Sequence, residues 1–437
     1  MVCITIYQDL VVFEADLILF SHFRPSVQNC STQPTMQSSI RIKLSLMMFL
    51  EFFIWGAWFV TLGTYLSKAL SSGGDEISAA YSTQSLGAII APFIIGLIAD
   101  RFFSAQRILG FLHFSGAVLM YFAAQSNSFS SFFPFILVYM ICYMPTIALV
   151  NSISFRQMKD PSAEFANIRI WGTIGWILAG LLIGYFFKWE SKGMLQNTFY
   201  MASGVSALLG FFSFLLPDTP PKYEAGTKPS IREILGLDAL KLFVDKNFLV
   251  FFISSVLICI PLAFYYQNAN IFLNSVGMEN AAGNMTFGQA SEVFFMLLIP
   301  IFLKRFGLKT TLLVGMAAWA IRYLLFAYGN AGEGVWMLFS GILLHGICYD
   351  FFFVTGQIYT DSKAGEKIKS SAQGLITLAT YGVGMLAGFW LAGKIYDNYT
   401  DPSGLQDWKM IWTIPAGIAA AVMLFYALIF KNEKINS

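Results

Sequence analysis

Residues 217–245 read PDTPPKYEAGTKPSIREILGLDALKLFVD and form a long polar interruption in an otherwise apolar chain. The first part of this stretch is rich in proline and the later part is amphipathic, which is typical of a linker followed by a helix at a membrane surface. On both sides of it, apolar runs of about 20 residues recur, and a run of this length spans a bilayer as a helix. The stretch therefore predicts a membrane protein built of two halves.

The composition also indicates a lipid environment. Hydrophobic residues make up 57% of the 437 residues. Charged residues make up 12%, whereas about 25% are charged in an ordinary soluble domain. The net charge of +2 is small and no basic tract alternates with exposed aromatic residues, so the sequence does not indicate nucleic acid binding. The five cysteines lack metal-ligand or disulfide-framework spacing, and we expect neither a metal nor a cofactor.

Six apolar segments precede the linker and six follow it. Breaks at glycine, proline and charged residues predict helices at 41–68, 77–99, 106–125, 130–157, 166–187, 198–216, 246–274, 284–304, 309–329, 334–360, 370–395 and 407–430. We expect an all-α membrane protein with twelve transmembrane helices in two six-helix bundles. The predicted domains are a bundle at 36–217, a cytoplasmic linker with an amphipathic helix at 218–245, and a bundle at 246–437.

The first 35 residues do not fit this pattern. Asp9, Glu14 and Asp16 interrupt their apolar run, and no basic segment precedes it as in a signal peptide. We expect residues 1–35 to be a non-native or disordered extension, with Met36 as the natural initiator.

The basic residues predict the orientation in the membrane. When successive connections are assigned alternately to the two sides, twenty Lys and Arg fall on the side of the linker and five on the other. Because cytoplasmic connections are enriched in Lys and Arg, we expect both termini and the linker in the cytoplasm.

A short motif follows the second predicted helix. Gly96, Asp100 and Arg101 resemble the cytoplasmic-loop motif of the major facilitator superfamily. In that motif an acidic residue caps a neighbouring helix and basic residues stabilise the inward gate. The resemblance and the division into two six-helix halves favour the major facilitator fold, with Asp100 and Arg101 as gating residues.

Five ionisable residues lie within predicted membrane helices: Glu51, Arg169, Glu292, Arg322 and Asp350. Because an ionised side chain at the bilayer centre costs about 2.5 to 3.5 kcal/mol, each needs a compensating role. That role can be functional or can be a buried pair that holds helices together. For Glu51 and Arg322 the two interpretations stay open.

Three predicted helices carry polar and aromatic side chains on one face. They are Arg169, Thr173 and Trp176 in the helix at 166–187, Gln289 and Glu292 in the helix at 284–304, and His345, Tyr349 and Asp350 in the helix at 334–360. Spacings of three, four and seven residues place such side chains together on a helix. Hydrogen-bonding groups beside aromatic rings suit a flat heterocycle that carries hydroxyls, and a sugar would also fit.

Coupling of transport to an ion requires a group that changes its charge. Burial favours the neutral form of a carboxyl group, so Asp350 and Glu292 are the candidates for proton coupling. Sodium coupling is the alternative, although the sequence shows no obvious cluster of carbonyl and carboxylate ligands for it.

The chain from about Ile40 to Lys431 resembles the nucleoside:proton symporters of the major facilitator superfamily, which are typified by bacterial nucleoside permeases. The resemblance is carried by WGAWFVTLGTYL, YMPTIALVNSISF, IRIWGTIGW, ILGLDALKLF, QASEVFFMLLIPIFL, AWAIRYLLFAYG, YDFFFVTGQIY and SAQG. It implies roles in nucleoside binding and proton coupling for Arg169, Thr173, Trp176, Gln289, Glu292, Tyr349 and Asp350. It also implies a multi-pass protein of the bacterial inner membrane, and we expect it to be a monomer.

The helix at 246–274 departs from that family. Ala263 and Tyr266 stand where the family has a Gln and an Asn that hold the nucleoside. Gln267 and Asn270 form a similar pair one turn later and are our candidates for substrate binding, or they are polar residues at the outer end of the helix. An enlarged aromatic at Trp176 is a further departure.

The predicted function is proton-coupled nucleoside import by alternating access. The same fold could instead carry a sugar or a nucleobase, because His345 also replaces an expected Tyr. A membrane-embedded enzyme is disfavoured because HExxH, Walker and Gly-x-Ser-x-Gly patterns are missing and the three His are scattered. A receptor that binds without transporting is the third alternative.

Overall fold

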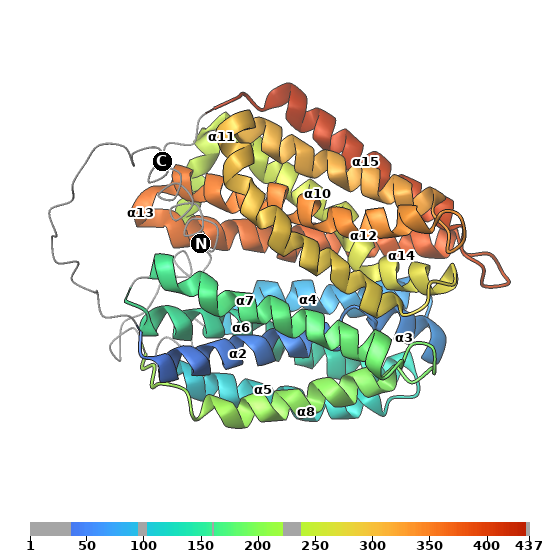
Figure 1. Ribbon diagram of the computed structural model, residues 1–437, viewed down its shortest axis with the longest axis horizontal. Coiled ribbons are helices and arrows are strands. Elements are labelled where there is room, and N and C mark those ends of the chain that lie inside the picture. Colours follow the sequence, from blue (N-terminus) through green and yellow to red (C-terminus); the bar gives the residue numbers. More distant parts are fainter. Residues whose placement is uncertain (1–35, 95–102, 160, 222–236, 434–437) are drawn as a thin grey trace, which may run out of the picture.

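The computed structural model describes residues 36–94, 103–159, 161–221 and 237–433. Within these residues the chain is helical, and its only β contact is an isolated bridge between Thr400 and Gln406. Figure 1 shows two helical bundles side by side, with the described start and finish of the chain at the same end as the flanks of the linker. We call this the linker end. The opposite end, formed by the connections 70–73, 125–128, 187–195, 276–280, 329–334 and 399–407, is called the far end.

The helices of the two bundles follow each other along the chain. The first bundle contains α2 (Ser38–Gly56), α3 (Leu62–Ala69), α4 (Gly74–Ile94), α5 (Ala105–Ala124), α6 (Phe129–Gln157), α7 (Pro161–Leu181) with the π-helix η2 (Leu182–Phe186), and α8 (Gln196–Ser213). The second contains α10 (Lys246–Ser275), α11 (Ala281–Tyr328), α12 (Val335–Tyr349), the π-helix η4 (Asp350–Val354), α13 (Thr355–Thr377), the π-helix η5 (Leu378–Gly384), α14 (Met385–Asn398) and α15 (Trp408–Ile429).

The described helices follow the predicted segments in order, and the predicted all-α membrane fold is confirmed. Eight of the described helical runs are long and apolar enough to cross a membrane. Most boundaries shift by a few residues, and the first predicted segment is divided into α2 and α3. α11 and α13 each contain a break where a connection was predicted. Gly307 and Gly365, with φ of 77° and 62°, turn the chain inside these two helices, a conformation that glycine adopts without strain.

Several predictions concern residues outside the described part of the chain. They include the extension at 1–35 and the gating pair Asp100 and Arg101. Of the linker, the structure describes 217–221 and a short 3₁₀ helix, η3 (Leu237–Val244). Residues 222–236 are outside it.

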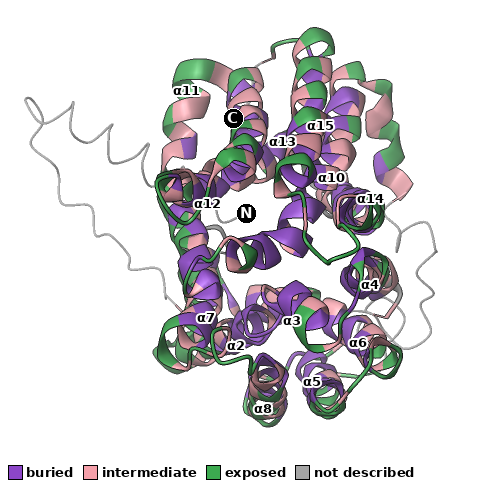
Figure 2. Cartoon of the chain, turned by 90° about the vertical axis from the view of Figure 1, so that its right-hand side faces the viewer, coloured by how far each residue is buried: buried purple, intermediate pink, exposed green. Residues whose placement is uncertain are grey.

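The distribution of burial fits a bundle surrounded by lipid. Figure 2 looks onto the far end and shows buried segments turned toward the interior of the bundles, with exposed segments on the periphery. Large apolar side chains on that periphery are strongly exposed, among them Phe111 (69%), Phe211 (68%) and Leu428 (84%). A surface of this kind is unfavourable in water and favourable in a bilayer.

The first bundle encloses a polar cluster around Glu51 in α2. Glu51 is fully buried, and its carboxylate lies 2.8 Å from Nε2 of His113 in α5. Thr146 in α6 donates to the other carboxylate oxygen over 2.6 Å, and Tyr143 donates to the Glu51 carbonyl over 2.7 Å. The cluster joins three helices of one bundle, which favours the structural interpretation of Glu51.

Removal of this carboxylate is expected to destabilise the protein. Glu51→Ala would leave the buried His113 without its partner and would remove one of the two acceptors of Thr146. Breaking a buried pair costs about 3 to 5 kcal/mol. Glu51→Gln keeps one acceptor oxygen and should cost less. Thermal unfolding of the purified protein in detergent measures the difference. An Ala variant that unfolds at the wild-type temperature would contradict the structural role.

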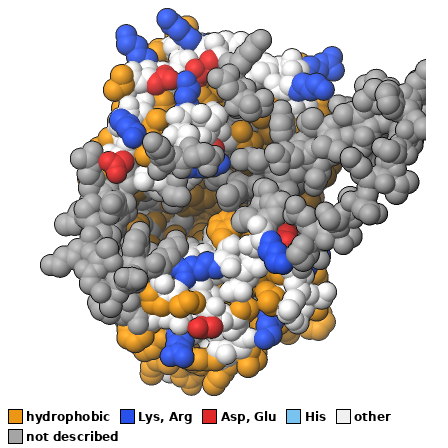
Figure 3. Space-filling view, turned by 90° about the vertical axis from the view of Figure 1, so that its left-hand side faces the viewer, with side chains coloured by type: hydrophobic (Ala, Val, Ile, Leu, Met, Phe, Trp, Pro, Cys, Tyr) orange, Lys and Arg blue, Asp and Glu red, His pale blue; other side chains and the backbone are white. Residues whose placement is uncertain are grey.

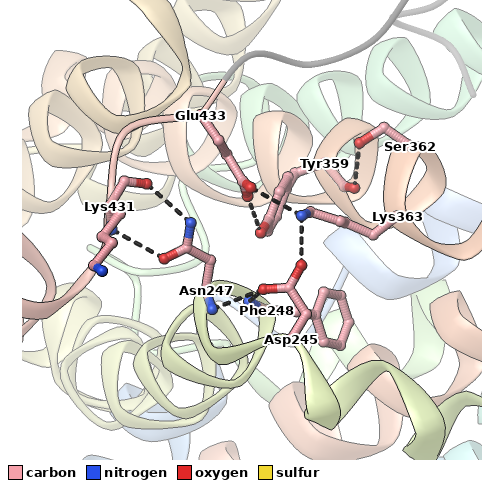
Figure 4. Close-up of polar contacts among 8 residues, drawn as sticks. All are labelled: Asp245, Asn247, Phe248, Tyr359, Ser362, Lys363, Lys431 and Glu433. Carbon is pink, nitrogen blue, oxygen red and sulfur yellow. Dashed lines mark hydrogen bonds and ion pairs between the residues drawn. The ribbon is translucent and has the colours of Figure 1, made fainter.

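At the linker end, polar contacts attach the chain after α15 to the start of α10 and to α13 (Figure 4). Asn247 exchanges two hydrogen bonds with the backbone of Lys431, at 3.1 and 3.0 Å. Lys363 bridges the carboxylates of Asp245 (2.5 Å) and Glu433 (2.8 Å). The ends of these three segments are therefore held together within the second bundle.

The ion pair is a minor source of stability. Burial alone would raise the pKa of Asp245, but hydrogen bonds from Lys363 and from backbone N–H groups at the start of α10 lower it below its usual value. Because the folded-state pKa is lowered, the contribution is present at neutral pH and is lost as the pH falls. Partly exposed pairs of this kind contribute at most about 1 kcal/mol.

Candidate functional site

The two bundles meet at the far end through charged and polar contacts. Asp397, at the end of α14, accepts hydrogen bonds from the backbone N–H groups of Gly74 (2.5 Å) and Asp75 (2.9 Å) at the start of α4. Lys394 pairs with the Asp75 carboxylate over 2.7 Å. An acidic side chain of one bundle thus caps a helix of the other, where the helix dipole favours negative charge.

A second contact at the far end is centred on Glu190, in the connection before α8. Its carboxylate accepts hydrogen bonds from the side-chain amides of Asn270 (2.8 Å) and Asn274 (3.0 Å) and from the N–H of Ala282 (2.8 Å). Asn270 also accepts a hydrogen bond from Thr64 of the first bundle over 2.5 Å. The far end is therefore closed by contacts between the bundles.

Glycines allow the helices to approach closely there. A Cβ atom at Gly393 of α14 would lie 2.5 Å from the carbonyl oxygen of Gly74 and 2.6 Å from Ser78. A Cβ atom at Gly184 would lie 2.5 Å from the backbone nitrogen of Gly283. The linker end differs: Figure 3 shows a hollow between the bundles, with hydrophobic side chains visible inside it.

Arg169 of α7 interacts with residues of both bundles. Its guanidinium stacks 3.9 Å from the ring centroid of Phe52. It also lies close enough to Tyr349, Glu292 and Tyr381 of the second bundle to interact with them electrostatically. A cation of one bundle therefore faces a carboxylate and two phenols of the other.

Aromatic rings surround this group. Trp176 meets Trp55 edge-on with ring centroids 5.5 Å apart. Across the two bundles, Phe59 of the first meets Tyr266 of the second at 5.6 Å. The hydroxyls of Tyr349 and Tyr381 are hydrogen-bonded over 2.7 Å. Such rings can stack on a flat ligand while their polar atoms hydrogen-bond to it.

The Glu292 carboxylate, 20% exposed, is held by His345. Nε2 of His345 lies 2.8 Å from Oε1 of Glu292, and Nδ1 lies 2.7 Å from Nη1 of Arg322. Arg322 is fully buried, and its guanidinium lies 3.6 Å from the ring centroid of Tyr265. Two of the intramembrane charges identified in the sequence are therefore joined through a histidine.

Asp350 begins the π-helix η4 and is fully buried. Neither of its carboxylate oxygens has a hydrogen-bond partner among the described residues. Glu292 is close enough to repel an ionised Asp350. A buried charge without a partner is costly, so this environment favours the neutral acid. π-Helical turns are frequent at functional sites.

The structure brings together most of the residues singled out in the sequence. Arg169, Glu292, Tyr349 and Asp350 belong to one electrostatic group. Thr173, Trp176 and Gln289 are half-buried on the same helices.

The candidates from α10 have different surroundings. The Asn270 amide is engaged in the far-end contact described above. Gln267 is 1% exposed, and both polar atoms of its side chain lack a partner in the described structure. In this conformation Asn270 contacts Thr64 and Glu190 of the first bundle.

Some contacts of the site were not predicted from the sequence. The link from Arg322 through His345 joins residues from two segments of the chain. Tyr266 and Tyr381 contribute rings whose positions no short motif marks. The signals available were Arg322 as an intramembrane charge and His345 one turn before Tyr349.

Comparisons with known proteins agree with the geometry. The family model described as "Nucleoside H+ symporter" matches residues 38–435. The chain belongs to the nucleoside H+ symporter family.

Three relatives from Escherichia coli (strain K12) illustrate the similarity. The chain is 50% identical to "Putative nucleoside transporter YegT" over 401 residues, covering 90% of this chain and 94% of the relative. It is 35% identical to "Xanthosine permease" over 412 residues, covering 90% and 97%. It is 32% identical to "Nucleoside permease NupG" over 413 residues, covering 91% and 97%.

Solved structures support the same fold. A crystal structure of the nucleoside transporter NupG superposes with a TM-score of 0.80 at 32% identity, covering 90% of this chain and all of the other. The peptide-transporter family member PepTSo superposes with a TM-score of 0.70 at 14% identity, covering 90% of this chain and 98% of that chain, and shows the fold alone. The protein is thus a multi-pass membrane transporter of this family and not an enzyme.

Proposed function

We propose that this protein imports a nucleoside together with a proton by alternating access. The observation that supports it best is the electrostatic interaction of Arg169 of one bundle with Glu292 and Tyr349 of the other. A ligand bound there would contact both bundles. Its binding energy could therefore depend on how the bundles are arranged, which is the requirement for a ligand-driven conformational change.

The proposed binding site divides its tasks by chemistry. Arg169, Thr173 and Gln289 supply hydrogen-bond donors, and the Glu292 carboxylate accepts from ribose hydroxyls. Trp176 and Tyr349 pack against the base. Gln267, whose buried polar atoms have no partner in the described structure, joins the site when the far end opens. Asn270 acts in closure of the far end and binds substrate only after that contact breaks.

We further propose that the far end faces the outside of a bacterial inner membrane, with both termini and the 218–245 linker in the cytoplasm. The excess of Lys and Arg at the linker end supports this orientation. Closure at the far end and the hollow at the linker end then correspond to an inward-facing state. Asp100 and Arg101 would stabilise the opposite, outward-facing state, and the protein would act as a monomer whose bundles are 36–217 and 246–437.

A sugar or a nucleobase is the competing substrate class. It is favoured by one observation: Tyr266 projects a ring toward Phe59 at a position where the family places an amide. A ring can stack on a pyranose, but it cannot replace both hydrogen bonds of an amide to a base.

Uptake and competition distinguish these classes. Purified protein in proteoliposomes is expected to take up labelled uridine, adenosine or xanthosine, with competition by nucleosides but not by sugars or free bases. Arg169→Ala should lower uptake by about ten- to a hundredfold, because it removes a charge-assisted donor. Inhibition by a sugar at least as strong as that by every nucleoside would refute the proposed substrate.

A further inference from the structure

Three ionisable side chains form a continuous hydrogen-bonded chain within the second bundle. Arg322, in the later part of α11, contacts His345 of α12 over 2.7 Å. His345 contacts Glu292, in the earlier part of α11, over 2.8 Å. Arg322 and His345 are at most 1% exposed, whereas the Glu292 side chain is 20% exposed. The hydrogen bonds therefore connect a fully buried guanidinium to a partly exposed carboxylate.

The chemistry of the partners fixes the direction of both hydrogen bonds. A guanidinium carries only donors and stays protonated in proteins, so Nδ1 of His345 must accept from Arg322. The imidazole proton then lies on Nε2 and is donated to Glu292. The imidazole ring of His345 is therefore neutral. The ring of Tyr265 stacks on it, with ring centroids 5.1 Å apart. Arg322 also packs on the Tyr265 ring, with its guanidinium carbon 3.6 Å from the ring centroid, so Tyr265 contacts both partners of the hydrogen bond.

The net charge of this cluster is zero only when Glu292 is ionised. A proton on Glu292 would weaken the bond from His345 and leave the Arg322 charge uncompensated in an apolar interior, which is costly. Arg169 adds a second cation near Glu292. The other titratable groups that face Glu292 are Asp350, Tyr265, Tyr266, Tyr349 and Tyr381.

We propose that His345, together with Arg322, is a positioning residue that keeps Glu292 ionised and oriented toward the substrate, so that Asp350 alone carries the transported proton. The two carboxyl groups thereby take different tasks. Glu292 has a donor and two nearby cations, whereas Asp350 has no hydrogen-bond partner in the described structure and a carboxylate as neighbour. Environments that differ in this way separate a permanently charged acceptor from a proton carrier.

The inference rests on the proposed function only in assigning Glu292 to the substrate. The protonation state of Glu292 can be measured without any substrate, by infrared difference spectroscopy of its carboxyl band during a pH titration. In the wild type, Glu292 is expected to contribute no protonated-carboxyl band near neutral pH.

The decisive variants are His345→Phe, His345→Gln and the double variant His345→Phe with Glu292→Gln. His345→Phe should produce a new protonated-carboxyl band near neutral pH, and the double variant should lose it. His345→Gln, whose amide can donate to Glu292, should restore the wild-type spectrum. A spectrum of His345→Phe that equals the wild type would overturn the inference, as would a new band that persists in the double variant.

Substrate binding provides a second readout. His345→Phe is expected to weaken uridine binding by about ten- to a hundredfold on the acidic side of neutrality, because a charge-assisted hydrogen bond is lost, with partial recovery at alkaline pH. His345→Gln should recover the wild-type pH profile. A loss of affinity that is equal at all pH values would indicate only a packing role and would overturn the inference. If uridine does not bind the wild type while the infrared result holds, the proposed substrate is wrong, but the positioning role of His345 is still supported.

Discussion

Asp350→Asn is expected to abolish proton-driven accumulation of substrate while preserving exchange of substrate across the membrane. Asn resembles the neutral acid that the buried, unpartnered site favours, so the loaded carrier can still reorient. It cannot release or take up a proton. One proton moving through 100 mV supplies about 2.3 kcal/mol, which is equivalent to about fiftyfold accumulation of substrate. In the variant, the internal and external substrate concentrations should become equal.

The measurement compares two assays of the same preparation in proteoliposomes. One follows uptake that is driven by an imposed pH gradient. The other follows exchange of labelled for unlabelled substrate without a gradient. Glu333→Gln, at an exposed carboxylate in the connection 329–334, is the matched control and should behave like the wild type. Undiminished accumulation by Asp350→Asn would exclude Asp350 as the proton carrier.

The second large effect is expected from Gly393→Leu, which should prevent closure of the far end. Even a Cβ atom at this position meets Gly74 and Ser78 within 2.6 Å, and a full side chain cannot be placed while α14 and α4 are in contact. Overpacking of this kind costs about 1 to 3 kcal/mol or more, so the closed state should be depleted by about ten- to a hundredfold. Transport should fall accordingly, because every cycle requires that closure.

The conformational shift can be measured directly with a cysteine at Thr64, which is 1% exposed at the closed end. In a background without other cysteines, Gly393→Leu should increase labelling of this cysteine by a membrane-impermeant maleimide. Gly417→Leu is the control, because Gly417 of α15 is exposed and a Cβ atom there meets nothing within 4 Å. Wild-type transport and a protected cysteine in Gly393→Leu would contradict the role assigned to this contact.

Much of the site could be predicted because its residues lie on regular helices. Arg169, Thr173 and Trp176 share a helix face by their spacing, and an intramembrane charge such as Glu292 is unfavourable without a function or a partner. The fold class followed from the length of the apolar runs and the polar stretch at 217–245, both of which are local properties of the sequence.

The remaining features depend on how helices pack, which periodicity does not specify. Glu51 finds His113 and Thr146 on neighbouring helices, so its structural role becomes visible only in three dimensions. Asn270 was a candidate for substrate binding because it resembles a family pair, yet its position along α10 brings it to Glu190 at the far end. The breaks at Gly307 and Gly365 lie within predicted connections, but the sequence did not indicate that each connection is only a tight kink between two helices.

Proton movement that accompanies nucleoside uptake is the most direct test of the central claim. Proteoliposomes that contain a pH-sensitive dye and are loaded with wild-type protein should acidify internally when a transported nucleoside is added outside. The same vesicles with Asp350→Asn should not acidify. Nucleoside uptake by the wild-type protein without any change of internal pH would contradict the account.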